Sequence, residues 1–386
     1  MTERPLTNLQ ILCGMLGRPT APFREEAIVE QVRQWAARWP LEFARDSVGN
    51  VLLMYRKGRG RALTKWVFAA HMDHPGFAAT GQKGLMLLAN FYGTVGRPYF
   101  KGARVRFFTP SGEACATIIG TADSPDSPWL ACRMKLQSPA DVPPCTLGMW
   151  DLPAMRIRGR TLSSRGCDDV VGSAAVVCAM RDIAESGIDA DVTGLLTRAE
   201  EAGFVGALAA CRARSLDGES LVVAIETSKA QPAARLGDGV VIRVGDKARI
   251  FDPCLTGHLV FVAEGLAKAD KAFRYTRQLM PGGTCESTAF AMFGYTAAAL
   301  CLPLGNYHNQ GPRNRIAAEQ INLGDFENLV KLLVGLARDK RKPADTDKAL
   351  KARLDGLLDQ RAKYLDNRSE MNAAIAGGAM IETTGF

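Results

Sequence analysis

The stretch Trp66–Ala70 has the sequence WVFAA and leads directly into His71. An uninterrupted apolar run of this length is typical of a strand with both faces buried, as in a parallel sheet. Parallel strands need crossover connections, which are most often helices. This run therefore predicts an α/β fold, and it draws attention to the polar residue that follows it.

Strand and helix patterns alternate through the second half of the chain, as such a fold requires. Helical patterns cover Val170–Ser186, Gly206–Ser215, Leu255–Lys268, Glu286–Phe293 and Phe326–Arg338. Apolar runs typical of strands occupy Val192–Leu196, Leu221–Ile225 and Ala297–Leu302. The alternation predicts a mostly parallel sheet with helices on both faces.

The segment between residues 75 and 162 has a different composition, rich in Gly, Pro and Ser and without a long helical pattern. Its β-like runs are Gly84–Phe91, Ala103–Phe108, Ala114–Gly120, Trp129–Leu136 and Ala154–Arg158. A chain of 386 residues is longer than one compact core usually holds. We therefore expect an all-β domain at residues 75–162, inserted into a catalytic α/β domain formed by residues 1–74 and 163–340.

Residues 341–386 form a charged tail that favours a helix. Its leucines at positions 350, 354, 357 and 358 fall on one face of that helix. Such a stripe packs either on the helix's own domain or on another subunit, and the sequence leaves both interpretations open.

Composition excludes several classes of protein. With 47% hydrophobic and 23% charged residues, the chain has the balance of a globular protein. No stretch approaches the ~20 apolar residues of a membrane span, and no signal peptide is evident. Ten cysteines occur without CxxC spacing, and the net charge of +8 comes mainly from dispersed basic residues. We expect a cytoplasmic protein that binds neither nucleic acid nor membranes.

Residues suited to binding metal ions recur beside these elements. His71, Glu200-Glu201, Glu226 and His308 follow the apolar runs, and Asp168-Asp169 precedes a helical pattern. Ligands of α/β sheets gather at the carboxyl ends of the strands, so these groups should converge. Imidazole and carboxylate together suit zinc, cobalt or manganese, and one carboxylate can bridge two metal ions.

Each of these residues also has a structural interpretation when it is taken alone. A single histidine is more often structural than a ligand, and Asp168-Asp169 would also serve as a helix N-cap. Glu200 and Glu201 could be a solvated loop pair. Beside a cation, however, one of them can bind the metal while the other accepts a proton from water. Asp73 can hold the ring of His71 if the strand continues, or it can be a turn residue.

Five motifs, in this order, resemble the glutamyl and deblocking aminopeptidase family, which includes the tetrahedral aminopeptidases. They are HMDHPGF (71–77), RGCDDVVG (165–172), TRAEEAGFVGA (197–207), VAIETS (223–228) and GGTCESTAF (282–290). The resemblance covers roughly residues 5–340. It implies two divalent metal ions, with zinc first and cobalt or manganese as alternatives. It also implies a homo-oligomer assembled through an inserted β-barrel.

The resemblance also assigns roles to individual residues. The metal ligands would be His71, Asp168, Glu201, Glu226 and His308, with Asp168 bridging both ions. Glu200 would be the general base, and Asp73 would orient His71. The chain departs from the family at His74, Val170 and Cys285, where the family has Glu, Arg and Asp. Glu226 stands where the family's aminopeptidases usually have Asp.

These observations predict a metal-dependent hydrolase of peptide or amide bonds, first of all an aminopeptidase. Because Glu at position 226 often accompanies other activities in the wider clan, a carboxypeptidase or an N-acyl amino acid amidohydrolase is the alternative. A non-catalytic relative, which keeps the fold for binding or assembly, is the alternative from another class. The substrate would accordingly be a peptide or an acyl amino acid.

Overall fold

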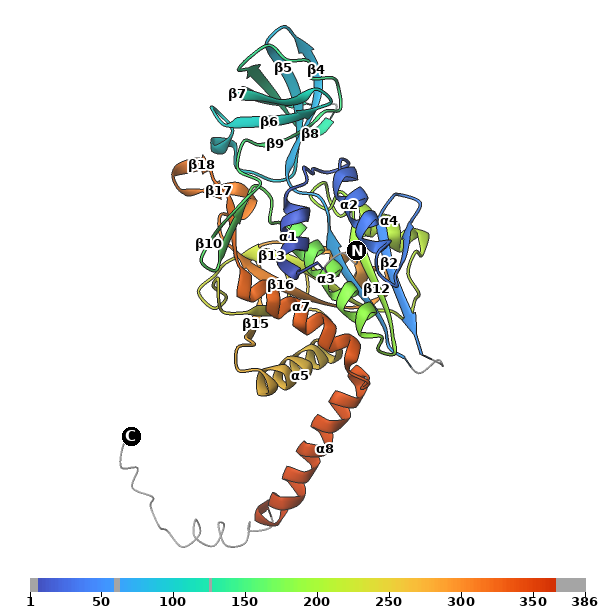
Figure 1. Cartoon of the computed structure of the whole chain (residues 1–386). Helices are drawn as coiled ribbons and strands as arrows, with labels where there is room; N and C mark the ends of the chain where they lie inside the picture. Colours follow the sequence, from blue (N-terminus) through green and yellow to red (C-terminus); the bar gives the residue numbers. More distant parts are fainter. Residues whose placement is uncertain (1–5, 59–62, 125–126, 366–386) are drawn as a thin grey trace, which may run out of the picture. The chain divides into compact units, whose positions relative to one another are not determined.

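A computed structural model describes residues 6–58, 63–124 and 127–365 of the chain. The chain forms two compact units, residues 1–340 and residues 341–386. The first unit is organised by an eight-stranded sheet with the strand order β1-β2-β12-β3-β13-β16-β14-β15 (Figure 1). Its four central strands, β12, β3, β13 and β16, run parallel, whereas β2 and β14 run antiparallel to their central neighbours. The predicted fold class, a mostly parallel sheet, is confirmed.

The strands of this sheet are short, and the central ones are almost completely buried. They are β1 Glu42–Arg45, β2 Val51–Lys57, β3 Lys65–His71, β12 Ala190–Thr197, β13 Leu221–Lys229, β14 Val240–Gly245, β15 Tyr275–Leu279 and β16 Thr296–Leu304. In β3, Trp66, Phe68 and Ala70 join the core on one face, while Val67 and Ala69 join the core on the other. Because successive side chains alternate between faces, a strand covered on both sides must be apolar throughout.

Helices cover both faces of the sheet, as the sequence predicts. They are α1 Asn8–Leu16, α2 Glu26–Ala36, α3 Val170–Ser186, α4 Val205–Ala213, α5 Pro253–Ala269, α6 Glu286–Met292 and α7 Leu323–Arg338. The larger core contains residues of α1, α2, α3, α5 and α7, and α3 is buried along most of its length. Helices α4 and α6 contribute to the core on the opposite face.

An antiparallel β-barrel is inserted between β3 and α3. Its strands close in the order β4-β5-β8-β7-β6-β9. They are β4 Gly76–Lys83, β5 Met86–Tyr92, β6 Arg104–Thr109, β7 Gly112–Ser124, β8 Ser127–Leu136 and β9 Leu147–Trp150, with the short helix η1 Arg97–Tyr99 between β5 and β6. The aromatic rings of Phe77, Phe91, Phe100 and Trp150 pack together inside it. The barrel therefore has a hydrophobic core of its own.

The structure differs from the sequence analysis in its small sheets. The run at Ala154–Arg158 forms β10 Met155–Arg158 outside the barrel; β10 pairs with β11 Thr161–Ser164, which pairs with β19 Glu319–Asn322. The pattern analysis also misses β14 and β15 of the eight-stranded sheet, β4 and β9 of the barrel, and β11 and β19 of this small sheet. Strands β15 and β19 lack the long apolar run on which that analysis depends. The remaining short elements are η2 Tyr307–Asn309, β17 Gln310–Gly311, η3 Pro312–Asn314, β18 Arg315–Ile316 and η4 Ala362–Leu365.

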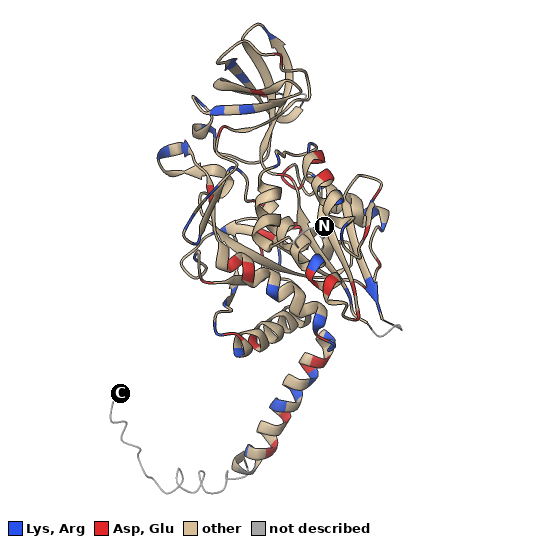
Figure 2. Cartoon of the chain, in the orientation of Figure 1, with Lys and Arg blue, Asp and Glu red and all other residues tan. Residues whose placement is uncertain are grey.

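The second unit contains one long helix, α8 Pro343–Arg361. Basic and acidic residues are interspersed along it (Figure 2). Leu350, Leu354 and Leu358 are each more than half exposed, and no residue of the helix is buried. Residues 366–386 of the predicted tail lie outside the described residues. Within the described part of the chain, no helix has the length and apolar character needed to cross a membrane.

Candidate metal centre and active site

The predicted site residues meet in one cleft beside the carboxyl ends of the central strands. His71, Asp168, Glu200, Glu201, Glu226 and His308 line the cleft. Asp73 is fully buried. The chain-distant motifs therefore lie together in the fold.

The backbone places each of these side chains differently. His71 is the last residue of β3, Glu200 follows β12 in a loop, and His308 lies in the loop after β16. Asp168 precedes α3, whose N-cap is Asp169. Glu226 does not end its strand, because β13 continues to Lys229.

His71 contacts two carboxylates through one ring nitrogen. Its Nε2 lies 3.5 Å from Oε1 of Glu226 and 3.6 Å from Oδ1 of Asp168. On the other side of the ring, Nδ1 lies 3.1 Å from the carbonyl oxygen of Asp73. A carbonyl can only accept a hydrogen bond, so Nδ1 donates to it, and Nε2 is the ring atom that faces the carboxylates.

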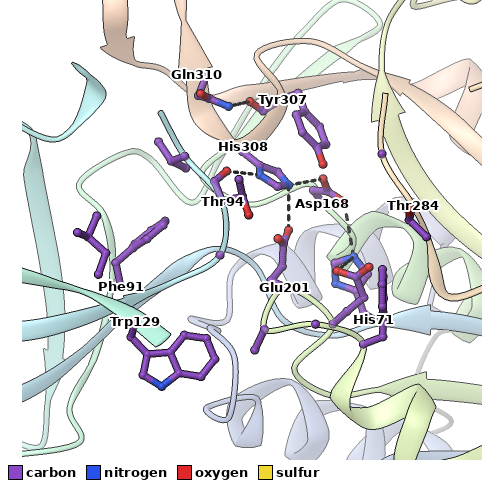
Figure 3. A pocket seen from close by; sticks show the side chains of 18 of the residues that line it. His71, Phe91, Thr94, Trp129, Asp168, Glu201, Thr284, Tyr307, His308 and Gln310 are labelled. Atoms are coloured by element: carbon purple, nitrogen blue, oxygen red, sulfur yellow. Dashed lines mark hydrogen bonds and ion pairs between the residues drawn. The ribbon is translucent and has the colours of Figure 1, made fainter. Parts of the chain in front are cut away.

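His308 repeats this arrangement on the other side of Asp168. Its Nε2 lies 3.1 Å from Oε1 of Glu201 and 3.4 Å from Oδ2 of Asp168 (Figure 3). Its Nδ1 donates to the carbonyl oxygen of Thr94 at 2.7 Å. Tyr307 stacks on the imidazole, with the ring centroids 3.8 Å apart. The ring is held from two directions, and its Nε2 is again directed at carboxylates.

The two histidine groups share Asp168, whose two oxygens face different imidazoles. Three overlapping sets of side chains have their possible ligand atoms within 4.8 Å of one another. They are His71 with Asp168 and Glu201, His71 with Glu200 and Glu226, and Asp168 with Asp169 and Glu226. The buried Oδ1 of Asp168 has no hydrogen-bond partner among the described residues. Imidazole and carboxylate donors that converge in this way fit two divalent cations with one bridging carboxylate.

The electrostatics of the site point in the same direction. Burial alone would lower the pKa of His71, but the charge of Glu200 and the contact with Asp168 raise this pKa well above its usual range. Burial and the charge of Asp168 raise the pKa of Glu226 to about 8. The site thus holds more carboxylates than its two imidazoles can neutralise, which favours the binding of cations.

Asp73 lies beside His71 and also contacts the loop after β12. Strand β3 has ended before Asp73, and its Oδ1 lies 3.6 Å from Nδ1 of His71. Its carboxylate also accepts hydrogen bonds from the backbone N–H groups of Glu200 and Glu201, at 2.9 Å and 3.0 Å. Asp73 therefore fixes the backbone that carries both glutamates, and it is the Asp73 carbonyl that holds His71.

Sequence reasoning missed Glu319, which is fully buried on β19. Its Oε2 accepts from the N–H groups of Cys167 and Asp168, and its Oε1 accepts from the N–H of His308. One carboxylate thus joins the backbone of the shared ligand to that of the second histidine. No local pattern signals this role, because its partners lie far apart in the chain.

Glu286, like Glu319, is a buried acid to which the sequence analysis gave no role. It is 2% exposed, and neither of its carboxylate oxygens has a hydrogen-bond partner among the described residues. Burial raises its pKa to about 7, and its charge in turn raises the pKa of Glu200. The one sequence feature that draws attention to Glu286 is the departure of residues 282–286 from the family motif.

The cleft continues from the candidate metal ligands toward the barrel. It has a volume of about 790 Å³, and Phe91, Thr94 and Trp129 line it from the barrel side (Figure 3). Gly283 and Thr284 line it before α6. This volume lies in the range of small-molecule sites, which is about 300–1,000 Å³.

A sheet of this topology, an inserted barrel and a buried cluster of imidazoles and carboxylates define a metallopeptidase of the aminopeptidase type. The family model of the M42 glutamyl aminopeptidases matches residues 136–332, and the chain belongs to that family. The resemblance predicted from the five motifs is confirmed.

Solved structures share the fold at low sequence identity. A TET aminopeptidase from a marine sediment archaeon of the Thaumarchaeota has a TM-score of 0.72 and 18% identity, covering 89% of this chain and 98% of that chain. The TET1 peptidase of Pyrococcus horikoshii has a TM-score of 0.69 and 22% identity, covering 86% and 99%. An aminopeptidase from Desulfurococcus kamchatkensis has a TM-score of 0.71 and 20% identity, covering 88% and 97%. No curated protein matches the chain.

Proposed function

We propose that this protein is an aminopeptidase with two divalent metal ions, in which Glu200 is the general base. The observation that carries this proposal is the pair of histidine groups joined by Asp168, with Glu200 beside them in the cleft. Membership of the M42 family supports the reaction class.

The proposed ligands divide into two sets around the shared carboxylate. His71 and Glu226 would hold one ion and His308 and Glu201 the other, with Asp168 bridging them. Divalent cations held here would lower the pKa of a coordinated water and would polarise the scissile carbonyl. Zinc is the first choice, and cobalt and manganese accept similar ligands.

Glu200 is placed to transfer the proton. It is 9% exposed and lines the cleft, with its Oε2 3.9 Å from Nε2 of His71. As the oxygen of water forms a bond with the carbonyl carbon, Glu200 takes the water proton. When the C–N bond breaks, Glu200 delivers that proton to the departing amine. The hydrogen bond from its backbone to Asp73 keeps the side chain over this position.

The test is the variant Glu200→Gln, which keeps the shape of the side chain but cannot accept the proton. We expect turnover to fall by at least about 10²-fold while two metal ions per chain remain bound. Glu201→Gln is the matched control, because it should lose metal as well as activity. A Glu200→Gln enzyme with wild-type turnover would show that another residue is the base.

Because Glu226 stands where the family's aminopeptidases usually have Asp, the alternative activity is that of a carboxypeptidase or N-acyl amino acid amidohydrolase. Aminoacyl anilides and N-acyl amino acids separate the two, since only an aminopeptidase needs a free substrate amine. We expect the anilides to be hydrolysed. A non-catalytic relative would bind well under two metal ions per chain after reconstitution, and it would hydrolyse neither substrate.

We also propose that the protein assembles into a homo-oligomer. The solved Pyrococcus horikoshii TET1 peptidase assembles into a tetrahedron or a large octahedral shell, and another structure, PhTET1-12s, is a dodecamer. Light scattering at micromolar concentration should give a mass of several chains, and a monomer would contradict the proposal. The ten free cysteines are compatible with the proposed cytoplasmic location, which cell fractionation can test.

A further inference from the structure

Helix α8 carries an apolar stripe along one face. Leu350, Leu354 and Leu358 follow one another at intervals of four residues, so their side chains share that face. They are 52%, 54% and 58% exposed. A helix normally packs such a stripe against a core or a partner, because leucine side chains gain free energy when they leave water. The stripe is therefore a candidate contact surface.

A charged residue stands at each end of the stripe, and the two have opposite signs. Asp347 lies seven residues before Leu354, and Arg361 lies seven residues after it. Seven residues make about two helical turns, so both charges fall on the leucine face. Leu350 and Leu358 lie four residues to either side of Leu354. The face is thus symmetric about Leu354 in the placement of its leucines and opposite in charge at its two ends.

Asp347 and Arg361 form no ion pair in the described part of the chain. Two ion pairs within the helix use other charged residues, Lys348 with Asp345 and Lys351 with Asp355. Asp347 and Arg361 lie about 21 Å apart along the helix axis, so they cannot pair with each other in one helix. Each charge is therefore available to a partner that approaches the leucine face.

The charges of the whole helix indicate the kind of partner. Four acidic residues, at positions 345, 347, 355 and 359, balance four basic ones, at positions 348, 351, 353 and 361. Helices that lie on anionic membranes are rich in Lys and Arg on their polar face, and nucleic acid also selects an excess of positive charge. A helix without net charge instead favours a partner that itself carries both signs.

A second copy of α8, running in the opposite direction, matches the leucine face at every position. Leu354 then lies against Leu354 of the second copy, and Leu350 lies against Leu358. Asp347 of each helix faces Arg361 of the other. In a parallel pair, by contrast, Asp347 would face Asp347 and Arg361 would face Arg361, so like charges would repel each other at both ends.

We propose that α8 pairs in an antiparallel arrangement with α8 of a second copy of this chain, with Leu354 at the centre of the contact. The family model ends at residue 332, so this contact lies outside the region that matches the family. It joins two chains independently of the barrel, and it does not rest on the proposed hydrolytic activity.

Disulfide formation in the full chain tests this arrangement. The antiparallel pair places position 354 against itself, so Leu354→Cys should form a covalent dimer on mild oxidation, as seen by non-reducing electrophoresis. The two copies of position 350 lie about 12 Å apart along the axis, beyond the reach of a disulfide. Leu350→Cys should therefore form no more dimer than the wild-type chain, whose ten native cysteines set the background.

A mixture of Leu350→Cys and Leu358→Cys chains should form the dimer that Leu350→Cys does not form by itself. A Leu354→Cys protein that stays at the wild-type background would overturn the proposal. A Leu350→Cys protein that cross-links as fast as Leu354→Cys would also overturn it, because contacts without a fixed direction or a parallel pair would then explain the dimer.

Charge exchange tests the ends of the contact. Added to Leu354→Cys, Asp347→Arg places an arginine opposite Arg361 of the second copy and should slow cross-linking roughly fivefold at low ionic strength. Adding Arg361→Asp as well exchanges the two charges and should restore the rate. Asp359→Arg is the control, because position 359 points away from the leucine face and the rate should not change.

Circular dichroism establishes that each variant is folded. A folded protein with exchanged charges that stays as slow as Asp347→Arg would show that these two charges do not face each other, and the proposal would fail. Cross-linking is measured without turnover, so this outcome is separate from that of the proposed activity.

Discussion

Asp168 is the residue that joins the two histidine groups of the candidate metal centre. Its two oxygens face His71 and His308, and no other residue contacts both imidazoles through its side chain in the described part of the chain. Its backbone N–H is fixed by Glu319, and its carbonyl accepts from His74. These two contacts fix the backbone from which the Asp168 carboxylate extends, so its position between the two histidines is set by the fold.

We expect Asp168→Asn to lower the metal content at both positions, because an amide oxygen is a weaker ligand and carries no charge. Glu226→Gln, by contrast, should weaken mainly one of the two. Zinc analysis after dialysis against limiting zinc measures the difference. Equal and full occupancy in Asp168→Asn would contradict the bridging role.

The buried Glu286 should make the free energy of unfolding of the metal-free protein depend on pH. Burial raises its pKa from 4.5 to about 7, so the unfolded chain releases this proton at lower pH than the folded chain. Stability is therefore retained below pH 4.5 and falls as the pH rises toward 7. We expect Glu286→Gln to remove this loss, on the order of 3 kcal/mol at pH 8.

Chemical denaturation at pH 5 and pH 8 measures the effect on the free energy of unfolding. The control is Glu264→Gln on α5, where the side chain is exposed. Its stability should follow the wild-type dependence on pH. A Glu286→Gln protein that loses as much stability as the wild type between these values would rule out the assignment.

At the scale of elements, the loop between β12 and α4 carries Glu200 and Glu201 and is closely packed. The Arg198 N–H donates to Asn50, and the Ala199 N–H donates to Glu25. Gly206, at the start of α4, leaves no room for a side chain: an added Cβ would lie 2.5 Å from the carbonyl oxygen of Arg198. The loop is thus held by contacts from the N-terminal part of the chain.

Gly206→Ala should therefore displace this loop. We expect a cost of about 1–3 kcal/mol in stability and a loss of activity larger than the loss of folded protein. Gly265→Ala on α5 is the matched control, because no atom lies within 4 Å of its added Cβ. It should be neutral or stabilise the protein by up to about 1 kcal/mol. Thermal unfolding and turnover distinguish the two variants.

At the scale of the whole molecule, the barrel lines part of the candidate site's cleft and also carries exposed apolar side chains. The Thr94 carbonyl orients His308, and Phe91 and Trp129 line the cleft. On the outside of the barrel, Met86 is 37% and Leu88 is 51% exposed. Large contiguous apolar patches mark contact surfaces between proteins, so this strand of the barrel is the position to test.

We expect Leu88→Asp to shift the proposed oligomer toward smaller species, because a charge cannot be buried there without a partner. Lys101→Asp, at another exposed position of the same barrel, is the control and should leave the assembly unchanged. Light scattering over a range of concentrations measures the masses. An unchanged mass for Leu88→Asp would place the contact surface elsewhere.

The sequence by itself determined the fold class and the types of ligand. Strand β3 was predictable because a strand buried on both faces is apolar throughout, and His71 then stands out as the polar residue at its end. Helix α3 was predictable from its long run rich in Ala and Val. The edge strand β15 was not predictable, since it is short and half-buried and has no such run.

Only the tertiary structure decided how the site is held and what lies beside it. Asp73 fixes the backbone of the two glutamates, and Glu319 joins the Asp168 and His308 segments. Nε of the buried Arg243 has no hydrogen-bond partner in the described part of the chain. These roles depend on contacts between residues far apart in the chain. Local patterns report the burial of a residue, whereas a hydrogen bond or an unpaired charge depends on which distant segment folding brings against it.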